Sequence, residues 1–121
     1  MNIPIFRAKQ IDGDEWVEGY YHKVHRAVDV GYGDIEKGEY IFDVEDGITA
    51  YDIDTKTLAI HFPNMIDKNG TKIFASLSKD GIGGDIVDVG YNYIREPMIM
   101  GKIIYVYNYD NSEVIGIYNE Q

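Results

Sequence analysis

The sequence contains no cysteine. This absence excludes disulfide bonds, thiolate nucleophiles and cysteine-based zinc sites together. Long hydrophobic runs are also missing, because no apolar segment approaches the ~18 residues that a membrane-spanning helix needs. Residues 1–10 lack the apolar region of a secretory signal and are followed directly by acidic residues. We therefore expect an intracellular protein that does not enter a membrane.

Basic residues are scarce beside acidic ones. The chain has 21 acidic and 11 basic residues, which gives a formal net charge of −10. Such a field repels phosphate groups and disfavours non-specific binding to duplex nucleic acid. It permits binding to a basic protein, including by mimicry of nucleic acid. The simplest interpretation of the acidity is solubility.

Tyrosine is the residue that the chain has in excess, with 11 Tyr against 4 Phe and 1 Trp. Tyr suits a half-buried strand face, and it also suits interfaces, where its ring is buried and its hydroxyl stays in water. Most of these residues are predicted to serve sheets rather than a binding platform. The length of 121 residues and the 45% hydrophobic content predict one globular domain over residues 1–121.

Short segments of strand-forming residues alternate with turn signals along most of the chain. Strands are predicted at residues 3–8, 15–24, 40–44, 48–53, 57–62, 84–89, 100–107 and 113–118. The first two should form a hairpin, because Asp12-Gly13 between them is a turn signal. Asp54-Thr55-Lys56 is predicted as a second turn. The pattern predicts a mainly β or α+β domain, built from small curved antiparallel sheets or a partly open SH3-like barrel.

One short helix is predicted near residues 71–79. Ile73, Phe74 and Leu77 fall on one helical face, and an Asp-Gly pair follows that would end the helix. Residues 26–39 are predicted as a loop, because glycines interrupt any periodicity there.

Four sequence blocks, taken in order, resemble a known family. They are Phe6-Arg7-Ala8 with Trp16-Val17-Glu18-Gly19-Tyr20, then Ile53–Leu58 with Asp67–Phe74, then Gly84-Asp85-Ile86-Val87, and last Glu113–Glu120. Together they are similar to the strand and turn signatures of the YopX family of phage and prophage proteins. The chain departs from that pattern where residues 75–83 intervene before the third block, and residues 23–52 match none of the blocks.

The resemblance implies a phage or prophage protein expressed in the cytoplasm of a bacterial host. It implies no activity, because no function is established for the YopX family. The chemistry has to be sought in the residues themselves.

Histidines are the first candidate metal ligands. His22 and His25 lie three residues apart, with Asp29 nearby. In a strand, residues at this spacing point to opposite sides, so we expect no chelation by this pair. His61 has no partner in the sequence. No metal site is therefore predicted.

Loop-forming segments give the remaining candidates. Asp52–Asp54 and Asp67–Gly70 are rich in oxygen ligands, but neither has the spacing of a twelve-residue calcium loop, and both are predicted as turns. Gly81–Gly84 leads into a strand and is not followed by Lys-Ser or Lys-Thr, so a phosphate-binding loop is not expected. No serine stands in a Gly-x-Ser-x-Gly motif. We expect a protein that is not an enzyme and that binds no cofactor.

Three functions stay open. The preferred one is a phage accessory protein that binds a host or phage protein, or itself as a homo-oligomer, through tyrosines of its sheets. The second is nucleic-acid binding, for which the cations have to gather on one face with Trp16, Tyr20 or Tyr21. Those cations are Arg7, Lys9, Lys23, Arg26, Lys68 and Lys72. The third is an enzyme with an unrecognised site, which requires a deep polar pocket containing a histidine and carboxylates.

Overall fold

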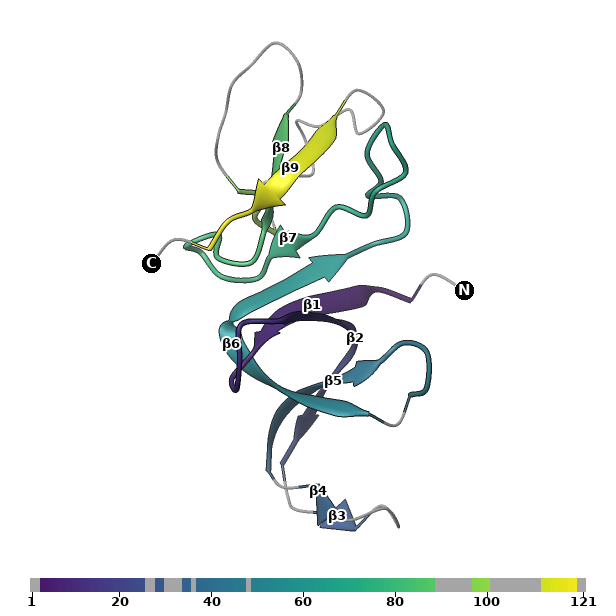
Figure 1. Ribbon diagram of the computed structural model, residues 1–121, viewed down its shortest axis with the longest axis vertical. Helices are drawn as coiled ribbons and strands as arrows, with labels where there is room; N and C mark the ends of the chain where they lie inside the picture. The colour runs from purple at the N-terminus through teal and green to yellow at the C-terminus, as the bar shows by residue number, and fades with distance from the viewer. Residues whose placement is uncertain are drawn as a thin grey trace.

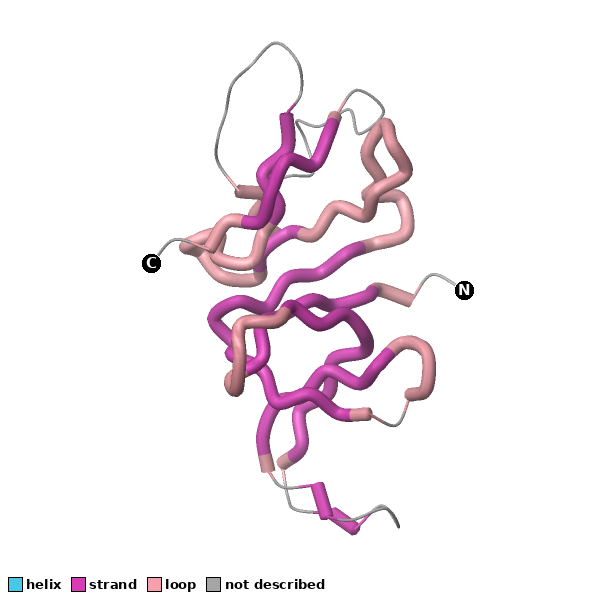
Figure 2. The backbone as a smooth tube through the Cα atoms, in the orientation of Figure 1, coloured by secondary structure: helices cyan, strands magenta, loops and turns pink. Residues whose placement is uncertain are grey.

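The computed structural model describes residues 3–25, 28–29, 34–35, 37–47, 49–88, 97–100 and 112–119 (Figure 1). Within these ranges the secondary structure consists of β-strands without a helix (Figure 2). The strands are β1 (Ile5–Gln10), β2 (Trp16–Val24), β3 (Val28–Asp29), β4 (Asp34–Ile35), β5 (Gly38–Asp43), β6 (Ala50–His61), β7 (Ala75–Ser76), β8 (Asp85–Asp88) and β9 (Glu113–Ile117). The predicted mainly β class is confirmed.

The main sheet has the order β1-β2-β5-β6-β7 and is antiparallel throughout. Because β1 pairs with β6 as well as with β2, this sheet curls back on itself into a partial ring, called here the curled sheet. Figure 1 shows β6 bending as it runs from the lower strands up to β7. The predicted curvature of the antiparallel sheet is therefore confirmed.

The first hairpin forms as the sequence predicts. Phe6 lies opposite Gly19 and Lys9 opposite Trp16, and the connection carries Gly13 with a φ of 103°. A positive φ at this angle is accessible to glycine without strain, which explains the Asp12-Gly13 signal.

The predicted turn at Asp54-Thr55-Lys56 was wrong, because β6 continues through it. β1 pairs with β6 on both sides of this point, and the register shifts between Arg7 and Lys9. The extra residues of β6 are held by Thr57, whose hydroxyl accepts a hydrogen bond from Lys9 N at 2.8 Å and donates one to Asp54 O at 2.6 Å. The residues that the sequence predicts as a turn therefore form a bulge in a bent strand.

The predicted helix at residues 71–79 was also wrong. A helix would bury Leu77 on the same face as Ile73 and Phe74, but Leu77 is exposed while the other two are buried. Instead β7 pairs with β6, and Ser76 N donates a 2.8 Å hydrogen bond to Met98 O on its other side. Backbone partners on both sides outweigh the local helical periodicity.

The C-terminal part of the molecule consists of β7, β8, β9 and the segment 97–100, which lies between β7 and β8. Met98 N donates to Asp85 O at 2.9 Å, so backbone pairing continues from the curled sheet through to β9. The predicted loop at 26–39 contains β3, β4 and the start of β5, and this part of the prediction was wrong. The predicted strand at 100–107 lies outside the described residues, except for its first residue.

Among the described residues, buried apolar side chains form two cores. The core of the curled sheet is centred on Ala8, Ile41, Ile53 and Leu58. The core of the C-terminal part consists of Met65, Ile73, Ala75, Val87 and Met98. In the described part of the chain, no helix is long and apolar enough to cross a membrane.

Gly83 supplies a test of the contact between the curled sheet and the C-terminal part. Its φ is +87°, and a Cβ atom added to it would collide with the carbonyl oxygen of Thr57 on β6. We expect Gly83→Ala to lower the free energy of unfolding by about 2–4 kcal/mol, from backbone strain and overpacking together. Urea unfolding followed by circular dichroism measures this change.

Gly116→Ala is the matched control, because Gly116 on β9 has no positive φ and open space at its Cβ position. We expect this variant to change the free energy of unfolding by less than about 0.5 kcal/mol. Equal effects of the two substitutions would contradict the close approach of Gly83 to β6.

Candidate functional site

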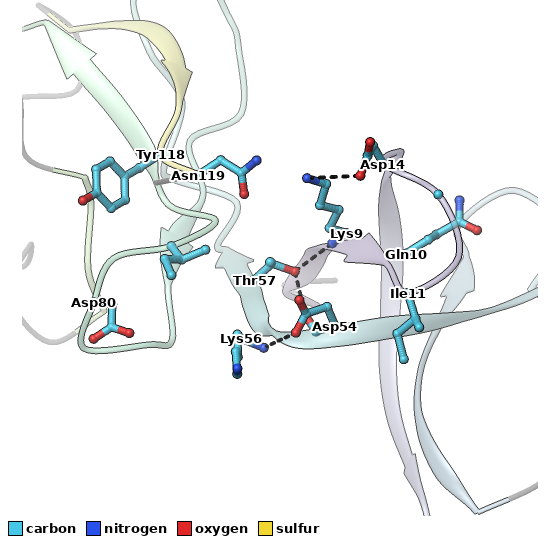
Figure 3. Close-up of a pocket in the computed structure, with 12 residues that line it drawn as sticks. Lys9, Gln10, Ile11, Asp14, Asp54, Lys56, Thr57, Asp80, Tyr118 and Asn119 are labelled. Carbon is cyan, nitrogen blue, oxygen red and sulfur yellow. Dashed lines mark hydrogen bonds and ion pairs between the residues drawn. The ribbon is translucent and has the colours of Figure 1, made fainter. Parts of the chain in front are cut away.

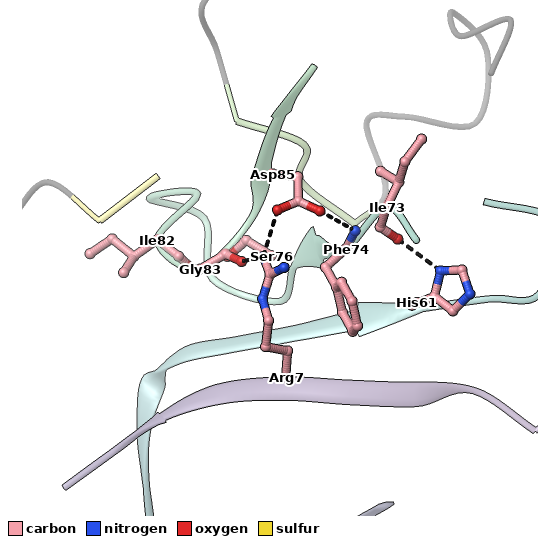
Figure 4. A network of polar contacts seen from close by, with 8 residues as sticks. All are labelled: Arg7, His61, Ile73, Phe74, Ser76, Ile82, Gly83 and Asp85. Carbon is pink, nitrogen blue, oxygen red and sulfur yellow. Dashed lines mark hydrogen bonds and ion pairs between the residues drawn. The ribbon is translucent and has the colours of Figure 1, made fainter. Parts of the chain in front are cut away.

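An ion pair between Arg7 on β1 and Asp85 on β8 is buried where the curled sheet meets the C-terminal part (Figure 4). Arg7 Nη2 lies 2.8 Å from Asp85 Oδ1 and donates a second hydrogen bond to Gly83 O at 2.7 Å. The two side chains are only 9% and 1% exposed. The glycine segment that sequence analysis placed at a helix end is therefore a turn that presents a carbonyl to Arg7.

Aromatic rings and one backbone amide complete the surroundings of this pair. The guanidinium carbon of Arg7 lies 4.3 Å from the ring centroid of Phe74 and 5.5 Å from that of Trp16. Phe74 N donates to Asp85 Oδ2 at 2.9 Å. Burial raises the pKa of Asp85, while Arg7 and the Phe74 amide act in the opposite direction. The ion pair and the stacking of the guanidinium on aromatic rings together join β1 of the curled sheet to β8 of the C-terminal part.

His61 lies next to this network and serves packing. Its Nδ1 lies 3.0 Å from the carbonyl oxygen of Ile73 and therefore carries the proton that it donates. Its ring centroid is 5.5 Å from that of Phe74. Burial lowers the pKa of His61 and outweighs the backbone hydrogen bond, so the imidazole is neutral at pH 7.

The carboxylate of Asp67 accepts hydrogen bonds from three backbone amides in and beside the turn that the sequence predicted. Its Oδ1 accepts from Asn69 N at 2.8 Å and Thr71 N at 2.9 Å, and its Oδ2 accepts from Val114 N at 2.9 Å. Burial alone would raise the pKa of Asp67, but the hydrogen bonds from Val114, Thr71 and Asn69 together lower it. The carboxylate thus ties this turn to β9, as the turn predicted for Asp67–Gly70 requires.

An open cleft of about 670 Å³ lies between the β1–β2 connection, the bulge of β6 and the end of β9 (Figure 3). Both lysine and aspartate side chains line the cleft, and Lys9 Nζ lies 3.6 Å from Asp14 Oδ1. Asp54 Oδ1 accepts from Lys56 N at 3.1 Å. Among the described residues, no group of three histidine or carboxylate side chains is placed to hold a metal ion.

In the described part of the chain, the cations proposed for nucleic-acid binding do not gather on one free basic face. Arg7 is buried against Asp85, and Lys9, Lys68 and Lys72 lie beside carboxylates. These pairs are Lys9–Asp14, Lys68–Glu113 and Lys72–Glu18, with N–O distances of 3.6, 3.6 and 3.3 Å. Lys23 lies on β2, and Arg26 is outside the described residues. Charges neutralised in this way leave little to attract phosphate.

The outer side of β2 and β5 carries a cluster of four aromatic rings. Tyr20 lies opposite Phe42, and His22 lies opposite Tyr40. His22 and Phe42 are in diagonal contact, with ring centroids 6.2 Å apart. We call Tyr20, His22, Tyr40 and Phe42 the aromatic face.

Strand alternation explains why this face points outward. The intervening residues Tyr21 and Ile41 pack into the core of the curled sheet, so their neighbours along each strand point the other way. Tyr21 also donates a hydrogen bond to Glu39, and burial together with this carboxylate raises the pKa of Tyr21 to about 12. Tyrosines therefore divide between core and surface in a way that composition could not reveal.

No protein-family model, no curated protein and no solved structure matches this chain at a significant level. The YopX-like resemblance accordingly rests on its four sequence blocks. The aromatic face is then the strongest candidate for function, because its rings belong to neither apolar core: Tyr20 and His22 are exposed, and Tyr40 and Phe42 are half-buried.

The Arg7–Asp85 pair gives a first prediction at this junction. Asp85→Asn leaves the buried guanidinium without a countercharge, and we expect it to lower the free energy of unfolding by about 3–5 kcal/mol. Arg7→Met combined with Asp85→Asn should cost less than the sum of the two single substitutions, because no unpaired charge stays buried. A double-mutant cycle from urea unfolding measures the coupling, and additive costs would contradict it.

His61 predicts a pH dependence of stability. Because the pKa of His61 is lowered in the folded protein, the unfolded chain binds a proton first, at about pH 6.5. The free energy of unfolding should therefore fall as the pH drops below about 6.5. The matched variant His61→Gln should show a shallower fall over the same range. Parallel curves for the two proteins would contradict a neutral buried imidazole.

Proposed function

We propose that this protein is a non-catalytic binding module that holds a protein partner on its aromatic face. The observation that carries the proposal is the display of four aromatic rings on one outer side of β2 and β5. Tyr20 is 39% exposed, and His22 is exposed beside it. Aromatic residues on a rigid sheet are favoured at protein interfaces, since they bury a large area with little loss of side-chain freedom.

The rigidity of the sheet beneath supports this assignment. The aromatic face lies directly over Ile41, which is completely buried in the core of the curled sheet. Its strands are paired along six consecutive positions, from Gly19–Asp43 to Val24–Gly38. A partner docking here would meet rings that are already in place, so the entropic cost of ordering the surface is small.

The YopX-like resemblance supplies the biological setting of the proposal. A divergent member of that group would act in the cytoplasm of a bacterial host, as a phage or prophage accessory protein. Its partner would then be a host or phage protein.

Affinity capture from a bacterial lysate treated with nuclease tests the proposal. We expect the wild-type protein to retain a partner in defined stoichiometry and Tyr20→Thr to lose most of it, because the substitution removes an exposed ring from the aromatic face. Ile115→Thr is the matched control, since Ile115 is an exposed residue on β9, away from this face. Quantitative mass spectrometry of the three eluates makes the comparison.

If the wild type, Tyr20→Thr and Ile115→Thr capture the partner equally, binding lies elsewhere and the assignment to the aromatic face is overturned. In a parallel capture without nuclease, material that is absent from the nuclease-treated sample would favour the nucleic-acid function instead.

A further inference from the structure

We infer that the partner segment seated on the aromatic face is an extended, positively charged stretch of protein rich in Lys and Arg. This inference rests on the proposed function and specifies its partner. It follows from the order of side chains across three neighbouring strands.

An acidic side chain borders the aromatic face on β6. Asp52 lies opposite Tyr40, which in turn lies opposite His22, so the three form one row across β6, β5 and β2. Asp52 is exposed. Neighbouring strands are about 4.8 Å apart, so an ammonium or guanidinium group can contact an aromatic ring and the carboxylate at the same time.

Further acidic side chains lie near this face. Glu45 is exposed in the β5–β6 connection, and Asp46 in the same connection accepts hydrogen bonds from Thr49. Glu18 precedes Tyr20 by two positions on β2 and shares its side, but its charge is paired with Lys72, whose Nζ lies 3.3 Å from Glu18 Oε1. Lys23 belongs to the opposite side of β2, because it alternates with His22. Among the described residues of β2, β5 and β6 that share this side, no lysine or arginine lies beside the four rings.

Charge complementarity selects a basic occupant over the alternatives. A second copy of this chain would bring a further net charge of −10 and the same acidic border to the contact. Nucleic acid would bring phosphates, which this field repels. A Lys- or Arg-rich segment gains both the attraction of the field and contact with the rings, and an extended one can span the row.

The probe is a synthetic peptide of about ten residues in which Lys and Arg alternate with Ser, a length sufficient to cross the three strands. Its matched control is a peptide with Glu at every basic position. Isothermal titration calorimetry gives the affinity, and ¹H–¹⁵N chemical-shift changes locate the contact. We expect binding of the basic peptide alone, with the largest shifts at Tyr20, His22, Tyr40, Phe42 and Asp52.

Two charge-matched variants separate a defined site from general attraction. Asp52→Asn and Asp80→Asn each remove one exposed carboxylate, but Asp80 lies in the connection between β7 and β8, in the C-terminal part of the molecule. We expect Asp52→Asn to weaken binding about threefold, as for one exposed charge pair, and Asp80→Asn to leave it nearly unchanged. Equal weakening by both variants, or shifts spread over all acidic residues, would overturn the inference.

Failure of this inference and failure of the proposed function give different results. If the basic peptide does not bind, yet Tyr20→Thr still loses the partner captured from lysate, the aromatic face binds a partner of other chemistry and the basic-occupant inference is wrong. If sedimentation shows a dimer that Tyr20→Thr abolishes, the occupant is a second copy. If Tyr20→Thr changes neither peptide binding nor capture, both proposals fall together.

Discussion

The buried ion pair between Arg7 and Asp85 is the constraint on which the arrangement of the two cores depends. Removing two charges from water is costly, and the cost is offset only if geometry and additional hydrogen bonds are good. Here the Gly83 carbonyl, the Phe74 amide and two aromatic rings supply those additions. A pair of this kind contributes orientation more than net stability, because few other placements of β8 on β1 would satisfy both charges.

Positions where local sequence and local structure agree were predicted well. The Asp12-Gly13 hairpin and the Asp67–Gly70 turn depend on glycines with positive φ and on hydrogen bonds between near neighbours, so the residue types at those positions predict them. The predicted helix at 71–79 and the turn at 54–56 failed because strands distant in sequence supply their partners. β7 is paired on both sides, and β6 is held through its bulge by β1.

For the candidate binding surface too, the sequence predicts what near neighbours determine but not what distant strands determine. Alternation along β2 and β5 predicts that adjacent tyrosines face opposite ways, but it does not say which face is covered by the rest of the chain. That choice is made by β1 and β6, which enclose Tyr21 and leave Tyr20 outside. The pairing of His22 with Tyr40 and of Tyr40 with Asp52 likewise depends on a register that no single segment encodes.

The closure of the curled sheet by β1 and β6 also bears on how the chain is made. β1 leaves the ribosome before β6 and β8, yet one of its edges pairs with residues as late as His61, and Arg7 can pair with Asp85 only after β8 has been made. During synthesis the N-terminal hairpin must therefore exist for some time with an open edge and an unpaired guanidinium. Such long-range closure slows folding and exposes strand edges to neighbouring nascent chains. At a net charge of −10 such chains repel one another, and this repulsion opposes their association before folding is complete.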